Sequence, residues 1–248
     1  MTEPLKSLLP IAATFILAGL IKGVVGLGLP TVAMGLLGLF MPPAKAASLL
    51  LIPAFVTNIW QLLEGPGLRP LLRRLSTPLA GVAIGTVAGA GLIAGAAGPA
   101  ATAGLGAALV VYAAIGLSKV AFGVRPLTER WASPLVGVTT GLITGATGTF
   151  VIPAVPYISA LGLERDDLVQ ALGLSFTVST VALAAGLAWH GALQADLAAT
   201  SVTALVPALA GMWLGGVVRR RVSGPLFRRV FLAGLLTLGA ELLWRSLG

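Results

Sequence analysis

Long stretches without a charged side chain are the feature that most limits what this chain can fold into. They cover residues 23–44, 46–63, 75–118, 131–163, 168–195 and 197–218. A run of about 18 or more apolar residues is long enough to cross a bilayer as a helix. With 57% hydrophobic and 10% charged residues, the chain has too few charges to cover a water-exposed surface. We therefore predict an all-α polytopic membrane protein with little aqueous domain.

The chain start, MTEPLKSLLP, carries one acid and one lysine before a long apolar run. A signal peptide would have a more basic start, a shorter apolar core and a small-residue cleavage site. We expect the first segment to belong to the mature protein. The net charge of +8 would suggest nucleic acid in a soluble chain, but here Lys and Arg cluster in short loops. That pattern orients membrane helices, so we expect lipid and no nucleic acid as partner.

A glycine pattern near the start of the chain recurs about halfway along it. Two further pairs of segments correspond in the same order. The matching positions are Gly19, Gly23 and Gly26 with Gly141, Gly145 and Gly148; Pro53 and Thr57 with Ser175 and Ser179; and 78–85 with 207–215. Glycine-rich apolar helices can look alike by chance, but here the order is kept over successive segments. We interpret the chain as two repeats, 1–122 and 133–248, joined by a cytoplasmic linker at 123–132.

Each repeat is expected to contain one glycine-broken segment followed by three helices. Proline and glycine turn signals separate these segments. The first repeat would hold a broken segment at 8–40 and helices at 46–64, 77–97 and 101–119. The second would hold a broken segment at 133–161 and helices at 167–189, 198–217 and 227–244.

The distribution of Lys and Arg decides how the broken segments cross the membrane. If each crosses once, and Lys22 is left aside, eight basic residues face one side and seven the other. If each enters and returns to the same side, the counts are twelve and three. The second count fits the excess of positive charge in cytoplasmic loops. We therefore predict two inverted repeats, each a re-entrant hairpin plus three transmembrane helices, with both termini outside the cytoplasm.

A hairpin tip inside the membrane exposes backbone groups that lipid cannot satisfy, so it must be packed in protein or line a wet cavity. In transporters with inverted repeats, the substrate site lies near the midplane, where half-helix ends meet. Helix N-termini favour anions, and glycine lets a ligand approach the backbone. We expect an anion site at the tips, with Gly23, Gly26 and Gly28 in the first.

Lys22 is the one charged residue of the first tip. An ionisable residue inside a membrane is costly, and it indicates function unless it is otherwise compensated. Contact with an anionic substrate is one interpretation; snorkelling to the outer surface and pairing with a distant acid are the others. Its counterpart in the second repeat is Thr144, so the two tips differ chemically.

Hydroxyl and amide groups extend the candidate site. The second tip offers Thr144, Thr147 and Thr149 beside Gly145 and Gly148. These groups suit an oxyanion held by hydrogen bonds, although small residues also serve close helix packing. The helix after each hairpin adds further polar side chains about halfway along its length: Thr57, Asn58 and Gln61 in the first repeat, Ser175 and Ser179 in the second.

The sequence contains no credible enzyme constellation. It has no cysteine, no paired carboxylates in an apolar segment, no metal-spaced histidines and no P-loop. We therefore expect no cofactor, no metal site and no ATP-driven step. His190 could carry protons or could anchor its helix end at the membrane interface. Glu241 could carry protons or could pair with Arg245 four residues later.

The paired segments GLIKGVVGLGLP and GLITGATGTFVIP, each opening one half, together with PLAGVAIG and PALAGMWLG, resemble the TauE/SafE family of sulfite and organosulfonate permeases. The resemblance covers nearly the whole chain. It implies a carrier of small anions in the bacterial inner membrane, with the glycine-rich hairpins at Gly19, Gly23, Gly26 and Gly28 and at Gly141, Gly145 and Gly148. The family often has three consecutive glycines followed by proline. Here the copies read GLGLP and GTFVIP.

We therefore expect a secondary transporter that moves sulfite, an organosulfonate or a related small organic acid by alternating access. Coupling to protons or sodium and assembly as a homodimer stay open. The alternative function is a membrane scaffold or assembly subunit that transports nothing.

Overall fold

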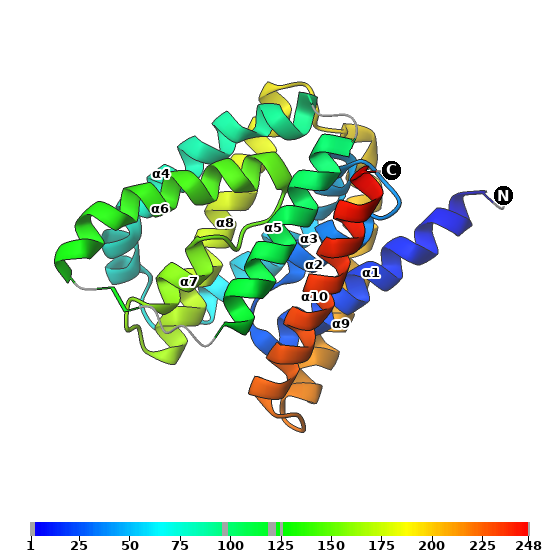
Figure 1. Cartoon of the computed structure of the whole chain (residues 1–248). Helices are drawn as coiled ribbons and strands as arrows, with labels where there is room; N and C mark the ends of the chain where they lie inside the picture. The colour runs from blue at the N-terminus through cyan, green and yellow to red at the C-terminus, as the bar shows by residue number, and fades with distance from the viewer. Residues whose placement is uncertain (1–2, 96–98, 119–122, 125, 248) are drawn as a thin grey trace.

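The computed structural model describes residues 3–95, 99–118, 123–124 and 126–247, and within them it contains helices and no strand (Figure 1). The helices are α1 (Glu3–Val25), α2 (Leu29–Leu37), α3 (Pro43–Leu63), α4 (Leu68–Gly95), α5 (Pro99–Leu117), α6 (Pro126–Thr147), α7 (Ala154–Ser159), α8 (Arg165–Trp189), α9 (Ala198–Arg219) and α10 (Gly224–Leu247), with a short 3₁₀ turn at Ala195–Leu197 before α9. Six segments in the described part, in α1, α3, α4, α5, α8 and α9, are long and apolar enough to span a membrane. The expectation of an all-α, multi-pass membrane protein is confirmed.

Two helices begin earlier than expected from the sequence. Helix α4 starts at Leu68 rather than 77, because its first turns hold Leu and Arg, which are good helix formers, and Pro70 is tolerated near a helix start. Helix α6 starts at Pro126, so residues 126–132 of the expected linker are helical. Proline is favoured at the first helical position because its fixed φ suits the helix. Residues 119–122 and 125 lie outside the described part of the chain.

The two glycine breaks are built alike. Helix α1 ends where Gly26 adopts a φ of 80°, and its N–H donates to the carbonyl of Lys22 at 2.7 Å. Helix α6 ends where Gly148 adopts a φ of 70°, and its N–H donates to the carbonyl of Thr144 at 2.7 Å. Positive φ is readily available only to glycine, and this backbone bond is a common helix C-cap. The second arms are short, with nine residues in α2 and six in α7.

Glycines hold α1 against α9 and α6 against α4 at backbone distance. A methyl group at Gly19 would lie 2.1 Å from the carbonyl oxygen of Ala208, and one at Gly23 would lie 2.9 Å from the Cα of Gly215. One at Gly145 would lie 2.3 Å from the carbonyl oxygen of Thr86. Small residues permit such close helix approach in membrane proteins. Both pairs run parallel, since positions increase together along the two partners.

The other two main helix pairs run antiparallel. Gly106 of α5 faces Gly239 of α10, and Gly116 faces Leu232. Helices α3 and α8 are joined by side-chain amides: Gln61 Nε2 donates to the Val169 carbonyl at 2.9 Å, and Gln170 Nε2 donates to the Leu62 carbonyl at 2.8 Å. Each bond satisfies a polar group inside the bundle, where an unpaired one would be costly.

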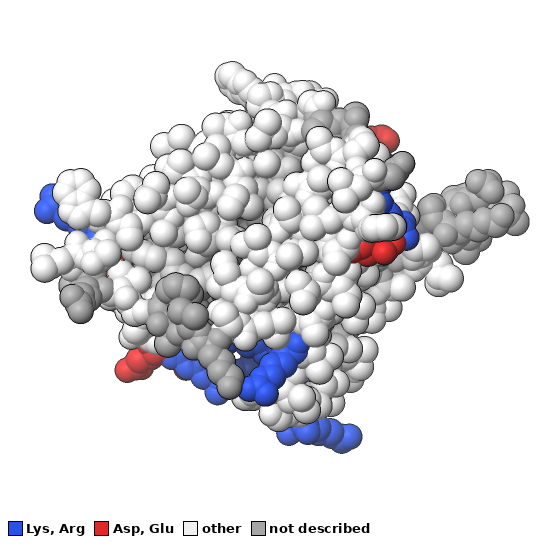
Figure 2. All heavy atoms as spheres, in the orientation of Figure 1, with Lys and Arg blue, Asp and Glu red and all other residues white. Residues whose placement is uncertain are grey.

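The surface divides into apolar flanks and charged helix ends. Figure 2 shows a broad face without charge and a gathering of basic atoms along its lower edge, where the turn between α9 and α10 lies in Figure 1. Large apolar side chains such as Ile84, Leu135 and Val206 are exposed on the flanks. A protein surrounded by lipid can expose such residues, whereas a soluble monomer exposes few large apolar patches.

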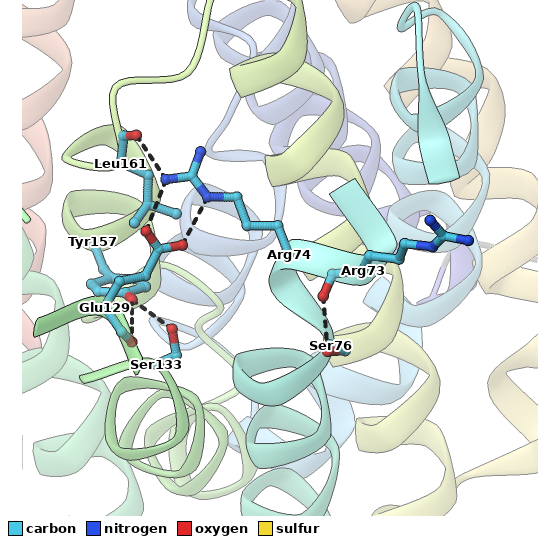
Figure 3. Close-up of polar contacts among 7 residues, drawn as sticks. All are labelled: Arg73, Arg74, Ser76, Glu129, Ser133, Tyr157 and Leu161. Carbon is cyan, nitrogen blue, oxygen red and sulfur yellow. Dashed lines mark hydrogen bonds and ion pairs between the residues drawn. The ribbon is translucent and has the colours of Figure 1, made fainter. Parts of the chain in front are cut away.

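An ion pair fastens the arginine-rich ends of α4 and α6. Arg74 Nε and Nη2 donate to the Glu129 carboxylate at 2.7 and 2.9 Å, and Nη2 also donates to the Leu161 carbonyl at 3.1 Å (Figure 3). Tyr157 lies 2.6 Å from the hydroxyl of Ser133, so α7 joins the same cluster. The Arg74 guanidinium lowers the pKa of Glu129 through these hydrogen bonds. The cluster ties the start of α6 to α4 and to the segment around α7.

Candidate functional site

A cavity of about 930 Å³ opens at the arginine-rich end of the bundle. Its wall combines the end of α1 and the following break with parts of α3, α7, α8, α9 and α10. Lys22, Gly23, Gly26, Thr57 and Gln61 supply polar or backbone surface inside it. Most of the remaining wall is apolar, from residues of α8 and α9 such as Leu172 and Met212. A pocket of this size with a few polar groups is typical of a small-molecule site.

Lys22 is the charged residue that lies deepest in this wall. It is 4% exposed, and among the described side chains it is the one Lys, Arg, Asp, Glu or His that is buried. Its Nζ donates to Thr57 Oγ1 at 3.3 Å and to Asn58 Oδ1. No carboxylate of the described residues pairs with it. The side chain therefore neither snorkels to the surface nor pairs with an acid, the two alternatives that the sequence left open.

Helix α3 is shaped to hold this lysine. Pro53 has no N–H, so it leaves the carbonyl of Leu49 without its usual helical donor, and Ser201 of α9 donates to that carbonyl at 2.8 Å. One turn later, Thr57 Oγ1 donates to the Pro53 carbonyl at 2.7 Å, which directs its oxygen lone pairs toward Lys22. The proline thus joins α3 to α9 about two helical turns before the residues that hold the lysine.

Four exposed charged residues line the same cavity at its mouth: Glu64, Arg165, Arg219 and Arg228. Glu64 accepts a hydrogen bond from Trp60 Nε1 at 2.5 Å. Three guanidinium groups against one carboxylate create a positive potential at the entrance. Such a potential raises the local concentration of anions and speeds their entry.

The first break faces the cavity with open backbone. A methyl group at Gly26 would meet no atom within 4 Å, so a ligand can approach the main chain there. Gly23 lines the cavity but also packs against Gly215 of α9. Gly28, with a φ of 105°, faces the ring of Phe231 instead. Because Gly23 lies level with Gly215, four residues before the end of α9, the first break is nearer to the arginine-rich end than to the middle of that helix.

The second tip lies outside this cavity, and its hydroxyls bond within their own turn. Thr144 Oγ1 donates to the Thr149 carbonyl at 3.0 Å, and the hydroxyls of Thr147 and Thr149 lie 2.7 Å apart. Gly145 packs against α4, and Gly148 against the side chain of Met34. In this arrangement the second tip has the features of a packed turn.

The predicted hydroxyls of α8 have different surroundings. Ser175 borders a void of about 10 Å³ next to Thr140. Ser179 Oγ is buried and has no hydrogen-bond partner in the described part of the chain. Its neighbour Thr180 accepts a hydrogen bond from Asn58 Nδ2 at 3.3 Å, which links α8 to the residue that holds Lys22. The structure thus gathers Lys22, Gly23, Gly26, Thr57 and Asn58 in one place, and none of the site residues predicted in the second half lines the same cavity.

The arginines at the mouth of the cavity are the residues that the predicted site lacked. Arg219 and Arg228 belong to the basic run VVRRRVSGPLFRR, which the sequence explains as an orientation signal. Nothing in their spacing indicates that they meet Arg165 and Lys22, because that meeting depends on how α8, α9 and α10 pack around α1. The described residues also include no group of three or more His, Cys, Asp or Glu placed to hold a metal ion.

Residues 11–242 match the sequence model of one protein family, described as "Sulfite exporter TauE/SafE". No curated relative and no solved structure matches the chain. The family match begins within α1 and ends within α10, and it includes the cavity, its lysine and both glycine breaks. On this match, and with its apolar helices, the chain belongs to the TauE/SafE family and is a multi-pass membrane transporter.

Proposed function

We propose that this chain is a secondary transporter for a small anion such as sulfite or an organosulfonate, and that the cavity around Lys22 is its binding site. The observation that carries the proposal is a buried lysine whose partners are both uncharged. A buried ammonium without a counter-ion is costly, and an entering anion would supply the missing charge. Glycine packing alone gives no reason to keep a lysine there.

The proposed site uses the first break and helix α3. Lys22 Nζ supplies charge, while Thr57, Gln61 and the open backbone at Gly26 supply hydrogen bonds. The apolar wall formed by residues such as Leu172 and Met212 would contact the carbon part of an organic anion. The cavity has room for a sulfonate with a short organic chain as well as for sulfite. Asn58, which does not line the cavity, would position the lysine by accepting a hydrogen bond from Nζ.

We further propose that the two halves are inverted repeats, each with a re-entrant hairpin. Four features support this. Helix α3 lies antiparallel to its counterpart α8, and α5 lies antiparallel to its counterpart α10. Helix α1, the first arm of one hairpin, runs parallel to α9 of the other half, and α6, the first arm of the other hairpin, runs parallel to α4. Helices α9 and α4 are counterparts in the two halves. The two breaks end in equivalent glycines with similar φ. Such relations are expected of a pseudo-two-fold axis in the membrane plane.

Alternating access follows from this symmetry. The cavity at the first break is open to the arginine-rich end, whereas the equivalent region at the second break is closed. In the opposite state, the second tip would open a mirrored path. Thr144, Gly145, Thr147, Gly148, Thr149, Ser175 and Ser179 would then contact the substrate. The depth of both tips in the bilayer stays a prediction.

The proposed orientation places the arginine-rich end in the cytoplasm of a bacterium and both termini in the periplasm. The described structure would then be open to the cytoplasm. Because the chain has no native cysteine, single cysteines can test this orientation. Cysteines at 45 and 194 should react with an impermeant thiol reagent from the periplasmic side, and those at 166 and 223 only from the cytoplasmic side. The reverse labelling would contradict the orientation.

Transport is tested with purified protein in liposomes loaded with candidate anions. We expect flux of sulfite or of ethanesulfonate above that of protein-free liposomes, and loss of most of this flux in Lys22→Gln. Arg245→Gln is a matched control, because Arg245 is an exposed residue paired with Glu241 at 2.7 Å at the opposite end of α10 from the cavity. Absence of flux for both anions, in protein that is folded, would contradict the proposed function and favour a non-transporting subunit.

A further inference from the structure

The hydrogen bonds of Lys22 match a neutral amine as well as an ammonium. An ammonium has three N–H donors, whereas a neutral amine has two. The structure provides two acceptors, Thr57 Oγ1 and Asn58 Oδ1. The empty site therefore satisfies both donors of a neutral lysine, and it leaves one donor of a charged lysine without a partner among the described residues. That third donor is the one that an anion in the cavity would accept.

A transport cycle makes the charge of an empty site costly. For net transport, a carrier that works by alternating access must return empty, and during that step the site is closed to water on both sides. A charged lysine with neutral partners would then sit uncompensated in a low-dielectric interior. With a bound monoanion, the same ammonium is neutralised. A lysine that is charged when loaded and neutral when empty avoids both unfavourable states.

The other charged groups that face the cavity do not offer the same exchange. They are Glu64 of α3, Arg165 of α8, Arg219 of α9 and Arg228 of α10, and all four are exposed at its mouth. Guanidinium groups keep their proton at any physiological pH. Helix α7 contributes only uncharged residues to the wall, such as Val155 and Ser159.

Two titratable residues elsewhere on the chain lie apart from the cavity. His190 is exposed next to Gly91, and Glu241 forms an exposed pair with Arg245. Neither of them lines the cavity. Among the described charged residues, Lys22 is thus the one that combines burial, contact with the cavity and a proton that it can lose.

We infer that Lys22 is also the proton carrier, so that one proton crosses the membrane with each monoanion. The inference rests on the proposed function. On the side of entry, the neutral amine takes a proton from water as the anion binds. On the side of release, the ammonium returns that proton to water as the anion leaves. The amine goes back neutral, and the complete step moves no net charge for a monoanion.

The test uses the full-length protein in liposomes and ethanesulfonate, a strong-acid anion that carries no proton of its own near neutral pH. A pH-sensitive dye inside reports protons, and valinomycin with equal potassium on both sides removes the membrane potential. We expect an inward anion gradient to acidify the interior by about one proton per anion taken up. Anion uptake without acidification would overturn proton coupling and leave the proposed function intact. No flux of ethanesulfonate or sulfite would contradict the proposed function itself.

A second variant tests whether Lys22 itself carries the proton. In Lys22→Arg, the charge is permanent, so the empty carrier should fail to return while the loaded carrier still crosses. We expect the ratio of anion exchange, measured with anion on both sides, to net uptake to rise at least tenfold over the native protein. Arg245→Lys, a change of basic residue at an exposed pair, should leave that ratio unchanged. An unchanged ratio in Lys22→Arg would overturn the role of Lys22 as proton carrier.

Discussion

Asn58 and Thr180 occupy equivalent positions in the two halves of the chain, and they bond to each other. Asn58 Nδ2 donates to Thr180 Oγ1 at 3.3 Å across a sequence separation of 122 residues, the offset that relates the glycine patterns. Residues related by a two-fold axis can touch only near that axis. The same asparagine accepts a hydrogen bond from Lys22. The lysine is therefore held at the place where the proposed repeats meet. A change at Lys22 would act through Asn58 on the hydrogen bond between the two halves.

Replacement of Asn58 by aspartate should give Lys22 a permanent counter-ion. The new carboxylate would occupy the lysine and repel an entering anion. Charge-assisted hydrogen bonds contribute about 1.5–3 kcal/mol, so we expect anion affinity to fall by about tenfold or more. Saturation kinetics of uptake in liposomes measure this, with Thr57→Ser as a control that keeps the hydroxyl acceptor. Unchanged or tighter anion binding by Asn58→Asp would contradict the proposed role of Lys22.

Replacement of the mouth arginines should slow anion entry without abolishing it. Arg219 and Arg228 are exposed, so their influence on an anion is long-range and screened by salt. We expect Arg219→Gln with Arg228→Gln to lower the initial uptake rate by about two- to tenfold at low ionic strength. The difference should largely disappear at high salt. A rate loss that salt does not reduce would argue against electrostatic attraction at the entrance.

The glycine contacts between helices should be essential for folding at specific positions only. A methyl group at Gly141 would lie 2.4 Å from the carbonyl oxygen of Val82, so α6 and α4 would have to separate. We expect Gly141→Ala to lower stability by about 1–3 kcal/mol, the usual cost of overpacking. Gly234 of α10 has no atom within 4 Å of the same position, so Gly234→Ala should be neutral or stabilising. Thermal unfolding in detergent compares the two, and equal stability of both variants would contradict the close packing.

The ion pair of Arg74 and Glu129 should make a small contribution to stability that depends on pH. Because the folded protein lowers the pKa of Glu129 below its ordinary value of 4.5, this contribution is present above pH 4.5 and is lost as the pH falls through the lower folded value. Arg74 is 39% exposed, so we expect less than about 1 kcal/mol. Native protein and Glu129→Gln should differ in unfolding temperature at pH 7 and converge in acid. A difference that persists or grows in acid would contradict this role.

The sequence predicted the helical class and the family, because those follow from the apolar runs and from the recurring glycine segments. The positive φ of Gly26 and Gly148 follows from the same property of glycine. Asn58 stood out as a polar residue in an apolar helix, and its side chain accepts a hydrogen bond from Lys22; its contact with a substrate stays a prediction. The start of α4 at Leu68 was missed, because the expected helix began at 77, after the arginines at 69, 73 and 74, although Arg favours helical structure.

Other features depend on tertiary packing that local patterns do not contain. The threonines of the second tip bond to their own turn rather than line the open cavity, and this depends on how the tip packs against α4 and Met34. The convergence of Arg165, Arg219 and Arg228 on the mouth joins residues from three helices. The pairing of α1 with α9, rather than with a helix of its own half, rests on matching glycine faces from both repeats.

The central claim is that Lys22 binds the transported anion in the cavity at the first break. It is tested most directly by equilibrium binding of radiolabelled sulfite and of labelled ethanesulfonate to purified protein in detergent, which separates binding from transport. Native protein and Arg245→Gln should bind at least one of the two anions with equal affinity. Lys22→Gln, shown to be folded by its unfolding transition, should bind it at least tenfold more weakly. Equal binding by the native protein and Lys22→Gln would contradict the account.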